Sequence, residues 1–275
     1  MRTAAYSGTV HPIERLRYVA RSQGAPAELL VEESAMALGP RRAAPDAMVA
    51  ACRRITDRQL TCGPLWWLCA RILCAPEPMR EAHLAVEELR ADPTARLLAG
   101  ALPDGATVVV VGDPDQAYGA LSRRGDVRSL VVDVDGEVYD VVRHLERADA
   151  PATPVPSRAV ATAVGDADLV LLEALAVGPG AALVPAGSRA AASVARTADV
   201  PVWLVAGAGR LLPGRMWDAL RDRWSQGVDP LDAAEEVLDL DLVGRLAGVD
   251  GPVEVADGLR RTDCPVAPEL FRLAG

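Results

Sequence analysis

Apolar residues recur at helical spacing from about residue 12 to residue 100. Residues 13–23 place Ile13, Leu16 and Val19 on one face, the spacing of an amphipathic helix. Three later segments repeat this pattern: 26–39, 44–55 and 82–93. The run 65–73 is apolar on all sides and contains Trp66 and Trp67, so we expect it in the core of a helical bundle.

The spacing changes from about residue 104. Continuous apolar runs now alternate with segments of helical spacing, which is typical of a parallel sheet covered on both faces. The predicted strands lie within 106–113, 128–136, 152–156, 166–177 and 200–209. A helical tail is predicted at 215–224 and 232–240, followed by a polar terminus. We therefore predict an α/β protein, with a helical N-terminal domain at 1–102 and a Rossmann-like, mostly parallel sheet domain at 103–275.

The composition restricts the partners. The net charge is −9, which argues against a nucleic-acid partner. The 275 residues include no Lys and no Asn, which excludes a P-loop lysine. Contacts to a phosphate must come from Arg, a helix N-terminus or a metal ion. Such an Ala- and Arg-rich chain without Lys suggests a GC-rich bacterial genome.

The cysteines indicate the compartment. There are five, with no C-x-x-C pair: Cys52, Cys62, Cys69, Cys74 and Cys264. An odd count without an export signal favours reduced thiols, and no apolar run reaches membrane-spanning length. We expect a soluble, cytoplasmic protein with no membrane partner.

Residues 207–214, GAGRLLPG, resemble two phosphate-binding motifs and match neither. Their glycine spacing is not that of the dinucleotide-binding fingerprint. Read as a P-loop, the stretch places Arg215 and Met216 where Lys and Ser or Thr are required. We interpret it as a glycine-rich exit from a strand.

Polar residues beyond the carboxyl ends of the predicted strands are the site candidates, because parallel sheets bind ligands there. Asp113 follows the first strand and Glu173 ends the fourth. Gly187, Ser188 and Arg189 open a helix, where free N–H groups and a guanidinium could hold an anion. Ser188 could equally be an ordinary N-cap, and Asp113 a turn residue.

Neither a metal nor a covalent mechanism is indicated. The three histidines are scattered along the chain: His11, His83 and His144. No Cys or Ser has an evident histidine partner, as an activated nucleophile would need. We predict no metal and no cofactor.

Three stretches of the sequence, taken together, resemble segments of a known protein family. They are DADLVLLEALAV followed by ALVPAGSRAAASVARTADVPVWLVAG, QLTCGPLWWLCAR, and TDCPVAPELF. In this order they resemble the family of eukaryotic initiation factor 2B α, β and δ subunits. That family includes bacterial and archaeal enzymes that isomerise methylthioribose-1-phosphate or ribose-1,5-bisphosphate.

The resemblance implies a helical domain joined to a Rossmann-like domain of the NagB/RpiA/CoA-transferase type, assembled as a dimer through the latter. In the enzymes a cysteine after the first strand and the Asp of a G-A-D motif move protons between C1 and C2 of the sugar. An Asn-Lys pair and a Gly-Thr turn help to hold the substrate. We accordingly expect a phosphorylated small molecule and a second copy of the chain as partners.

The proton-transfer residues of the family are missing here. Gly112 or Asp113 stands at the place of the cysteine, and Leu175 at the place of the acid. Val184 and Pro185 replace the Asn-Lys pair. Because isomerisation needs an acid and a base on opposite sides of the sugar, these changes remove the family chemistry.

Part of the binding frame remains. Gly187-Ser188 corresponds to the Gly-Thr turn, and Thr61 to the threonine of an R-P-T stretch. With Arg189 and Gly112, these are the predicted ligand-binding residues. Glu173 lies two positions before the lost acid, a separation that keeps the two residues on the same face of a continuous strand.

Three functions therefore stay open. The first is a non-catalytic protein that binds a sugar phosphate or nucleotide. The second is an aldose-ketose isomerase or related enzyme with Glu173 or Asp113 as its new general base. The third is a purely structural dimeric partner, in which a capped helix would cover a filled site at Gly187–Arg189.

Overall fold

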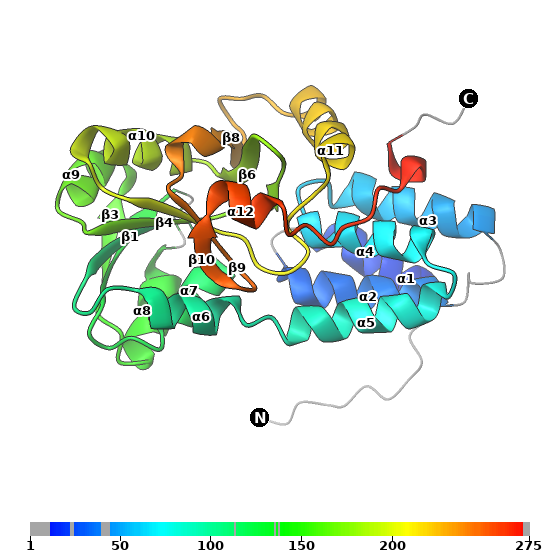
Figure 1. Cartoon of the computed structure of the whole chain (residues 1–275), viewed down its shortest axis with the longest axis horizontal. Coiled ribbons are helices and arrows are strands. Elements are labelled where there is room, and N and C mark those ends of the chain that lie inside the picture. The colour runs from blue at the N-terminus through cyan, green and yellow to red at the C-terminus, as the bar shows by residue number, and fades with distance from the viewer. Residues whose placement is uncertain are drawn as a thin grey trace.

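The computed structural model describes residues 12–22, 25–39, 45–112, 114–134, 136 and 138–271. The chain forms a helical region and a sheet region side by side (Figure 1). The candidate base Asp113 lies outside the described residues. None of the helices within these ranges combines the length and apolar composition that crossing a membrane would require.

Five helices build the helical region, as the spacing predicts. They are α1 (Pro12–Arg21), α2 (Ala27–Leu38), α3 (Pro45–Arg58), α4 (Gly63–Cys74) and α5 (Pro78–Arg90). Helix α4 lies at their centre, and Leu65, Trp66 and Trp67 are fully buried. A helix that is apolar all round is stable only when its neighbours cover it, which explains this central position.

The main sheet has seven strands in the order β10-β9-β7-β4-β1-β2-β3, and only β10 is antiparallel to its neighbour. The strands are β1 (Thr107–Val111), β2 (Arg128–Asp133), β3 (Ala152–Pro156), β4 (Leu169–Glu173), β7 (Val202–Val205), β9 (Arg245–Gly248) and β10 (Gly251–Glu254). The predicted α/β class and mostly parallel sheet are confirmed.

Helices cover both faces of this sheet. One face carries α6 (Thr94–Ala101), α7 (Asp115–Leu121) and α8 (Val138–Arg147). The other carries α9 (Val160–Gly165), α10 (Ser188–Ala198) and α12 (Val255–Leu259). In β1, Val108 and Val110 face the first group of helices while Val109 and Val111 face the second. Both sets are buried, which explains why the strand is a continuous apolar run.

A second, antiparallel sheet has the order β5-β6-β8. Its strands are β5 (Ala176–Val177), β6 (Ala181–Pro185) and β8 (Glu235–Asp239). The prediction of a helix at 232–240 is therefore wrong, because pairing with β6 aligns Leu183 with Val237 and overrides the helical spacing. The predicted strand 166–177 is also interrupted, since β4 ends at Glu173 and β5 joins the other sheet.

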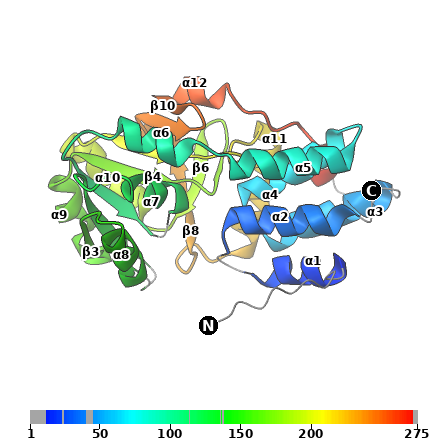
Figure 2. The same cartoon turned by 90° about the horizontal axis from the view of Figure 1, so that it is seen from below.

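The two regions are not separated at one point of the chain. Helix α6 packs against α7 and β10, while α11 (Gly214–Gly227) buries Met216 and Trp217 in the helical region. The last described segment also returns to the helices, where Leu270 is fully buried (Figures 1 and 2). The division at residue 102 stays a prediction.

Candidate functional site

Glu173 ends β4 beside β1, where the order of strands reverses direction. In open α/β sheets, ligands bind in the crevice at such a switch point. Here Glu173 stands at this point of the sheet and is buried, at only 5% exposure. One oxygen accepts hydrogen bonds from the backbone N–H groups of Gln116 (2.8 Å) and Ala117 (3.0 Å) in the first turn of α7.

The other oxygen of Glu173 is paired with Arg210. Nη1 of Arg210 lies 3.0 Å from Oε1, and Arg210 is 8% exposed. Arg210 belongs to the loop after β7, and its carbonyl accepts a hydrogen bond from the N–H of Val177 at 2.8 Å. The predicted strand exit at 207–214 is thus a loop whose one charged side chain enters the crevice.

Burial raises the pKa of Glu173, while Arg210 and the N–H groups of α7 act in the opposite direction. A raised pKa is common for a general base. Here, however, Oε2 accepts two backbone hydrogen bonds and Oε1 is paired with a guanidinium. The side chain therefore has the contacts of an internal counterion.

A second internal carboxylate occupies the N-terminus of α10. Gly187 has φ 89°, a left-handed conformation that suits glycine, and it directs the first turn of the helix toward β8. The backbone N–H of Arg189 donates to Oε1 of Glu236 at 2.8 Å. A carboxylate thus sits where the sequence predicts a bound anion.

Ser188 does not cap this helix. Its hydroxyl is buried, at 1% exposure, and has no hydrogen-bond partner among the described residues. The guanidinium of Arg189 belongs to an exposed residue. The side chain of Ser188 therefore does not cap α10 as the alternative prediction requires. Glu236 accepts a hydrogen bond from the first turn of the helix instead.

Two of the positions where the sequence departs from the isomerases, Gly112 and Pro185, meet beside α10. A side chain at Gly112 would contact Pro185 at 3.4 Å and Val134 at 3.7 Å. One at Gly187 would contact Val134 at 3.0 Å. The carbonyl of Gly112 accepts a hydrogen bond from the hydroxyl of Tyr118 at 2.5 Å. The wall of the predicted anion site is therefore largely apolar.

Thr61 lies at the entrance to α4, near the end of β4. Two residues later, the N–H of Gly63 donates to the carbonyl of Leu175 at 3.1 Å. Leu175 packs against the helical region, while Glu173 faces α7. The two residues do not act on one face, because the strand ends between them.

Two cavities lie between the helical region and the sheet, on either side of the loop after β7. The first, about 250 Å³, is lined in part by Arg210, Gln116 and three carboxylates: Glu28, Asp92 and Asp115. The second, about 380 Å³, lies beyond β7 and β9. No group of three or more His, Cys, Asp or Glu side chains in the described ranges is placed to hold a metal ion.

The sequence reasoning missed Arg210, Glu236 and Asp92. Asp92 accepts hydrogen bonds from the N–H groups of Thr94 (2.9 Å) and Ala208 (2.8 Å), which joins the helical region to the loop. A signal for Arg210 existed, since it is the one charged residue between 202 and 214. Glu236 gives no comparable signal, because the spacing of residues 232–240 predicts a helix and not the strand β8.

Solved structures with the same fold come from translation initiation factors. No protein-family model and no curated protein matches the sequence. The eIF-2B translation initiation factor of Pyrococcus horikoshii OT3 superposes with a TM-score of 0.73 at 13% identity, over 90% of this chain and 98% of that one. The eIF2B beta subunit of Chaetomium thermophilum has a TM-score of 0.73 at 14% identity, over 94% and 92%.

A third match is the tetrameric eIF2B-beta2-delta2 complex of C. thermophilum, with a TM-score of 0.72 at 16% identity, over 88% of this chain and 90% of that one. These values cover the helices and the sheet together. The chain has the eIF2B fold. The resemblance read from the sequence is confirmed for the eIF2B-like architecture, at identities that establish the fold alone.

The eIF2B fold gives the two internal carboxylates their context. Glu173 ends β4 of the main sheet, and Glu236 lies on β8 of the antiparallel sheet. Glu173 meets α7 and Glu236 meets α10, so each helix end is neutralised from within the chain.

Proposed function

We propose that this chain is a non-catalytic protein with the eIF2B fold, which acts by binding other molecules and does not isomerise sugar phosphates. The engagement of Glu173 supports the proposal. Its carboxylate is buried, paired with Arg210 and hydrogen-bonded to the first turn of α7.

The chemistry of isomerisation gives the physical reason. Moving a proton between C1 and C2 needs a base that can take it and an acid on the other side of the sugar. Leu175 and Gly112 supply neither group, and using Glu173 would require breaking a buried ion pair. Opening such a pair costs about 3–5 kcal/mol, which would add to the barrier of the reaction.

Binding of a phosphorylated small molecule is a second candidate. It is favoured by Arg210 on the wall of the 250 Å³ cavity and by the buried, unpartnered hydroxyl of Ser188. The carboxylates of Glu28, Asp92 and Asp115 line the same cavity and oppose it, because they repel a phosphate. An anion would have to displace Glu173 from Arg210 or Glu236 from Arg189.

Assembly is the third part of the proposal. A tetrameric eIF2B complex is among the structures with this fold, and we infer that this chain forms a homodimer in the cytoplasm. Light scattering at micromolar concentration tests it, because a dimer would have twice the chain mass of 28.9 kDa.

The deciding experiment is incubation of the pure protein with ribose-1,5-bisphosphate and methylthioribose-1-phosphate. Aldose-ketose exchange is followed by NMR, and a thermal-shift titration with the same compounds reports binding. We expect no turnover. Turnover that Glu173→Gln abolishes, and that the half-buried Glu235→Gln on β8 leaves unchanged, would overturn the proposal. Saturable stabilisation without turnover would support the phosphorylated ligand.

A further inference from the structure

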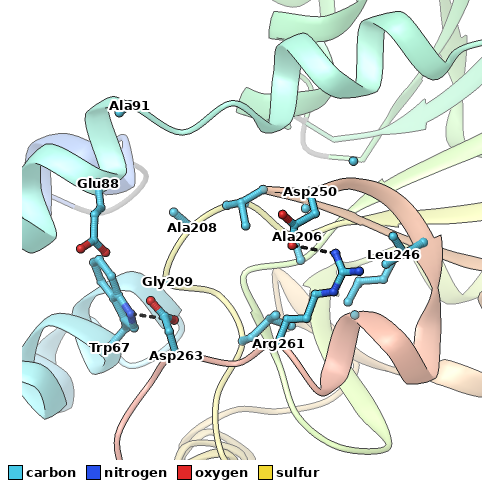
Figure 3. A pocket seen from close by; sticks show the side chains of 17 residues that line it. Trp67, Glu88, Ala91, Ala206, Ala208, Gly209, Leu246, Asp250, Arg261 and Asp263 are labelled. Atoms are coloured by element: carbon cyan, nitrogen blue, oxygen red, sulfur yellow. Dashed lines mark hydrogen bonds and ion pairs between the residues drawn. The ribbon is translucent and has the colours of Figure 1, made fainter.

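The larger cavity, about 380 Å³, borders the loop after β7 and is lined by neither Glu173 nor Arg210. Figure 3 shows the side chains that line it. Helices α4 and α5 form one wall, and the β9–β10 hairpin with the segment after α12 forms the other. Its volume lies in the range of small-molecule sites, and such sites are common between domains.

The floor of this cavity is apolar and made of small residues. Ala206, Gly207 and Gly209 come from the loop after β7, and Leu246 comes from β9. All four are buried. Leu211, Val249 and Val253 add apolar surface nearer the mouth. A ligand would therefore bury mainly hydrocarbon or ring surface here.

The rim is acidic. Three carboxylates line it, those of Glu88, Asp250 and Asp263, against one guanidinium, that of Arg261. Asp250 neutralises Arg261, with 2.7 Å between Oδ2 and Nη1. On the opposite side, Arg71 pairs with Glu88, Glu81 and, more distantly, Asp263. Both oxygens of Glu88 accept hydrogen bonds from this guanidinium. The lining thus keeps an excess negative charge.

Asp263 lies at the mouth of the cavity, with its side chain 60% exposed. Its Oδ1 accepts a hydrogen bond from the indole N–H of Trp67 at 3.1 Å. Its Oδ2 lies 3.9 Å from Arg71, too far for a hydrogen bond, and makes none with the described residues. In Figure 3 this carboxylate lies at the cavity, between Trp67 and Arg261. Oδ2 is therefore a hydrogen-bond acceptor beside an apolar floor.

We propose that this cavity binds a small, mostly apolar molecule with a cationic nitrogen group, such as an amine or amidine, which Asp263 recognises. An apolar body fits the floor, and a positive group matches the excess charge of the rim. Phosphates and carboxylates are excluded by the same charge. The site is separate from Glu173, and the inference does not depend on the absence of isomerase activity.

Benzamidine and benzoate are the probes, because they share a ring and differ in the sign of their charge. Binding to the intact protein is measured by ligand-observed NMR and calorimetry, with inorganic phosphate as a third probe. We expect saturable binding of benzamidine that weakens with added salt, and no saturable binding of benzoate or phosphate.

Two variants locate the site. Asp263→Asn keeps an acceptor for Trp67 and removes the charge, and we expect about tenfold weaker benzamidine binding, the size of one charged hydrogen bond. Val249→Trp fills the mouth from a residue that is 44% exposed, and should abolish binding without unfolding the chain. Glu87→Gln, exposed on α5 but not lining the cavity, is the matched control.

The proposal is overturned if benzoate binds as well as benzamidine, if benzamidine does not bind, or if Val249→Trp leaves its affinity unchanged. If Asp263→Asn does not fold, Glu88→Gln replaces it, with a severalfold loss expected. The isomerase assay tests the site at Glu173, whereas benzamidine binding tests the cavity at Asp263. A negative result in one assay therefore leaves the other proposal standing.

Discussion

Glu173 and Arg210 form a buried ion pair, with Oε1 of the glutamate 3.0 Å from Nη1 of the arginine. Both are less than a tenth exposed, and they come from the ends of neighbouring strands, β4 and β7. Removing a charge from water costs several kcal/mol. For Glu173 this cost is reflected in a pKa that burial raises. Arg210 is the largest of the influences that lower the pKa of Glu173 against this burial.

Removing one partner should destabilise the fold more than removing both. Arg210→Met leaves a buried carboxylate without its cation, and we expect a loss of about 3 kcal/mol in the free energy of unfolding at pH 7. Adding Glu173→Gln should recover most of it, since the amide oxygen still accepts from α7. Urea titrations of the four proteins form a double-mutant cycle.

An exposed pair provides the control for this cycle. Arg143 pairs with Asp140 on α8, with both side chains mostly exposed, so Arg143→Met should cost less than about 1 kcal/mol. The pH adds a second check. Because the pKa of Glu173 is raised, its protonated form favours the folded state, so the deficit of Arg210→Met should shrink as the pH is lowered. A deficit that does not change with pH would contradict the buried carboxylate.

The position of Glu173 could be predicted from the sequence, while its role could not. The switch-point rule places it at the carboxyl end of β4, and the structure agrees. Its counterion, Arg210, is 37 positions further along the chain. It lies in a loop that resembles two phosphate-binding motifs and matches neither. Pairing between the ends of two strands depends on strand order, which the one-dimensional pattern does not contain.

Glu236 should protect the N-terminus of α10 from external anions. Glu236→Ala removes the acceptor of the Arg189 N–H group, and the loss of such a cap costs about 1 kcal/mol. It also uncovers N–H groups beside the unpartnered hydroxyl of Ser188. We expect sulfate at tens of millimolar to raise the melting temperature of the variant more than that of the wild type.

Chloride at equal ionic strength separates binding from screening in this experiment. Glu254→Ala, an exposed residue at the end of β10, is the matched control and should respond to sulfate as the wild type does. An equal response from Glu236→Ala would mean that its carboxylate does not occupy an anion site.

Strand β8 explains why this carboxylate was missed. Residues 232–240 have acidic and apolar positions compatible with a helix, yet Leu238 is buried and the segment pairs with β6. The partner strand lies about 50 residues earlier and is itself short. Long-range pairing decided the structure of a segment whose local pattern was ambiguous.

Buried thiols should make the fold sensitive to alkaline pH. Burial raises the pKa of Cys62 from 9.0 to about 11 and that of Cys264 to about 12. The neutral thiols favour the folded state, so this stability is present below pH 9 and is lost as the pH rises through the folded pKa. The chain has no lysine to titrate in the same range.

Cys62→Ala isolates one thiol. Between pH 9 and 11, wild-type stability should fall more steeply than that of the variant by about 1.4 kcal/mol per pH unit. Guanidinium titrations at pH 8, 9.5 and 10.5, under reducing conditions, measure the slopes. Parallel slopes would show that Cys62 ionises equally in both states.

Gly209 should tolerate a side chain less well than a glycine of similar conformation elsewhere. Its φ is +74°, and an added Cβ would lie 3.0 Å from the Trp67 ring and 3.2 Å from Cα of Pro64. Gly105 has φ +67° with nothing within 4 Å of such a Cβ. Gly105→Ala therefore reports backbone strain alone, about 1–2 kcal/mol, and Gly209→Ala adds overpacking of about 1–3 kcal/mol. Urea titrations compare the two, and equal losses would mean that Trp67 and the loop after β7 are not in close contact.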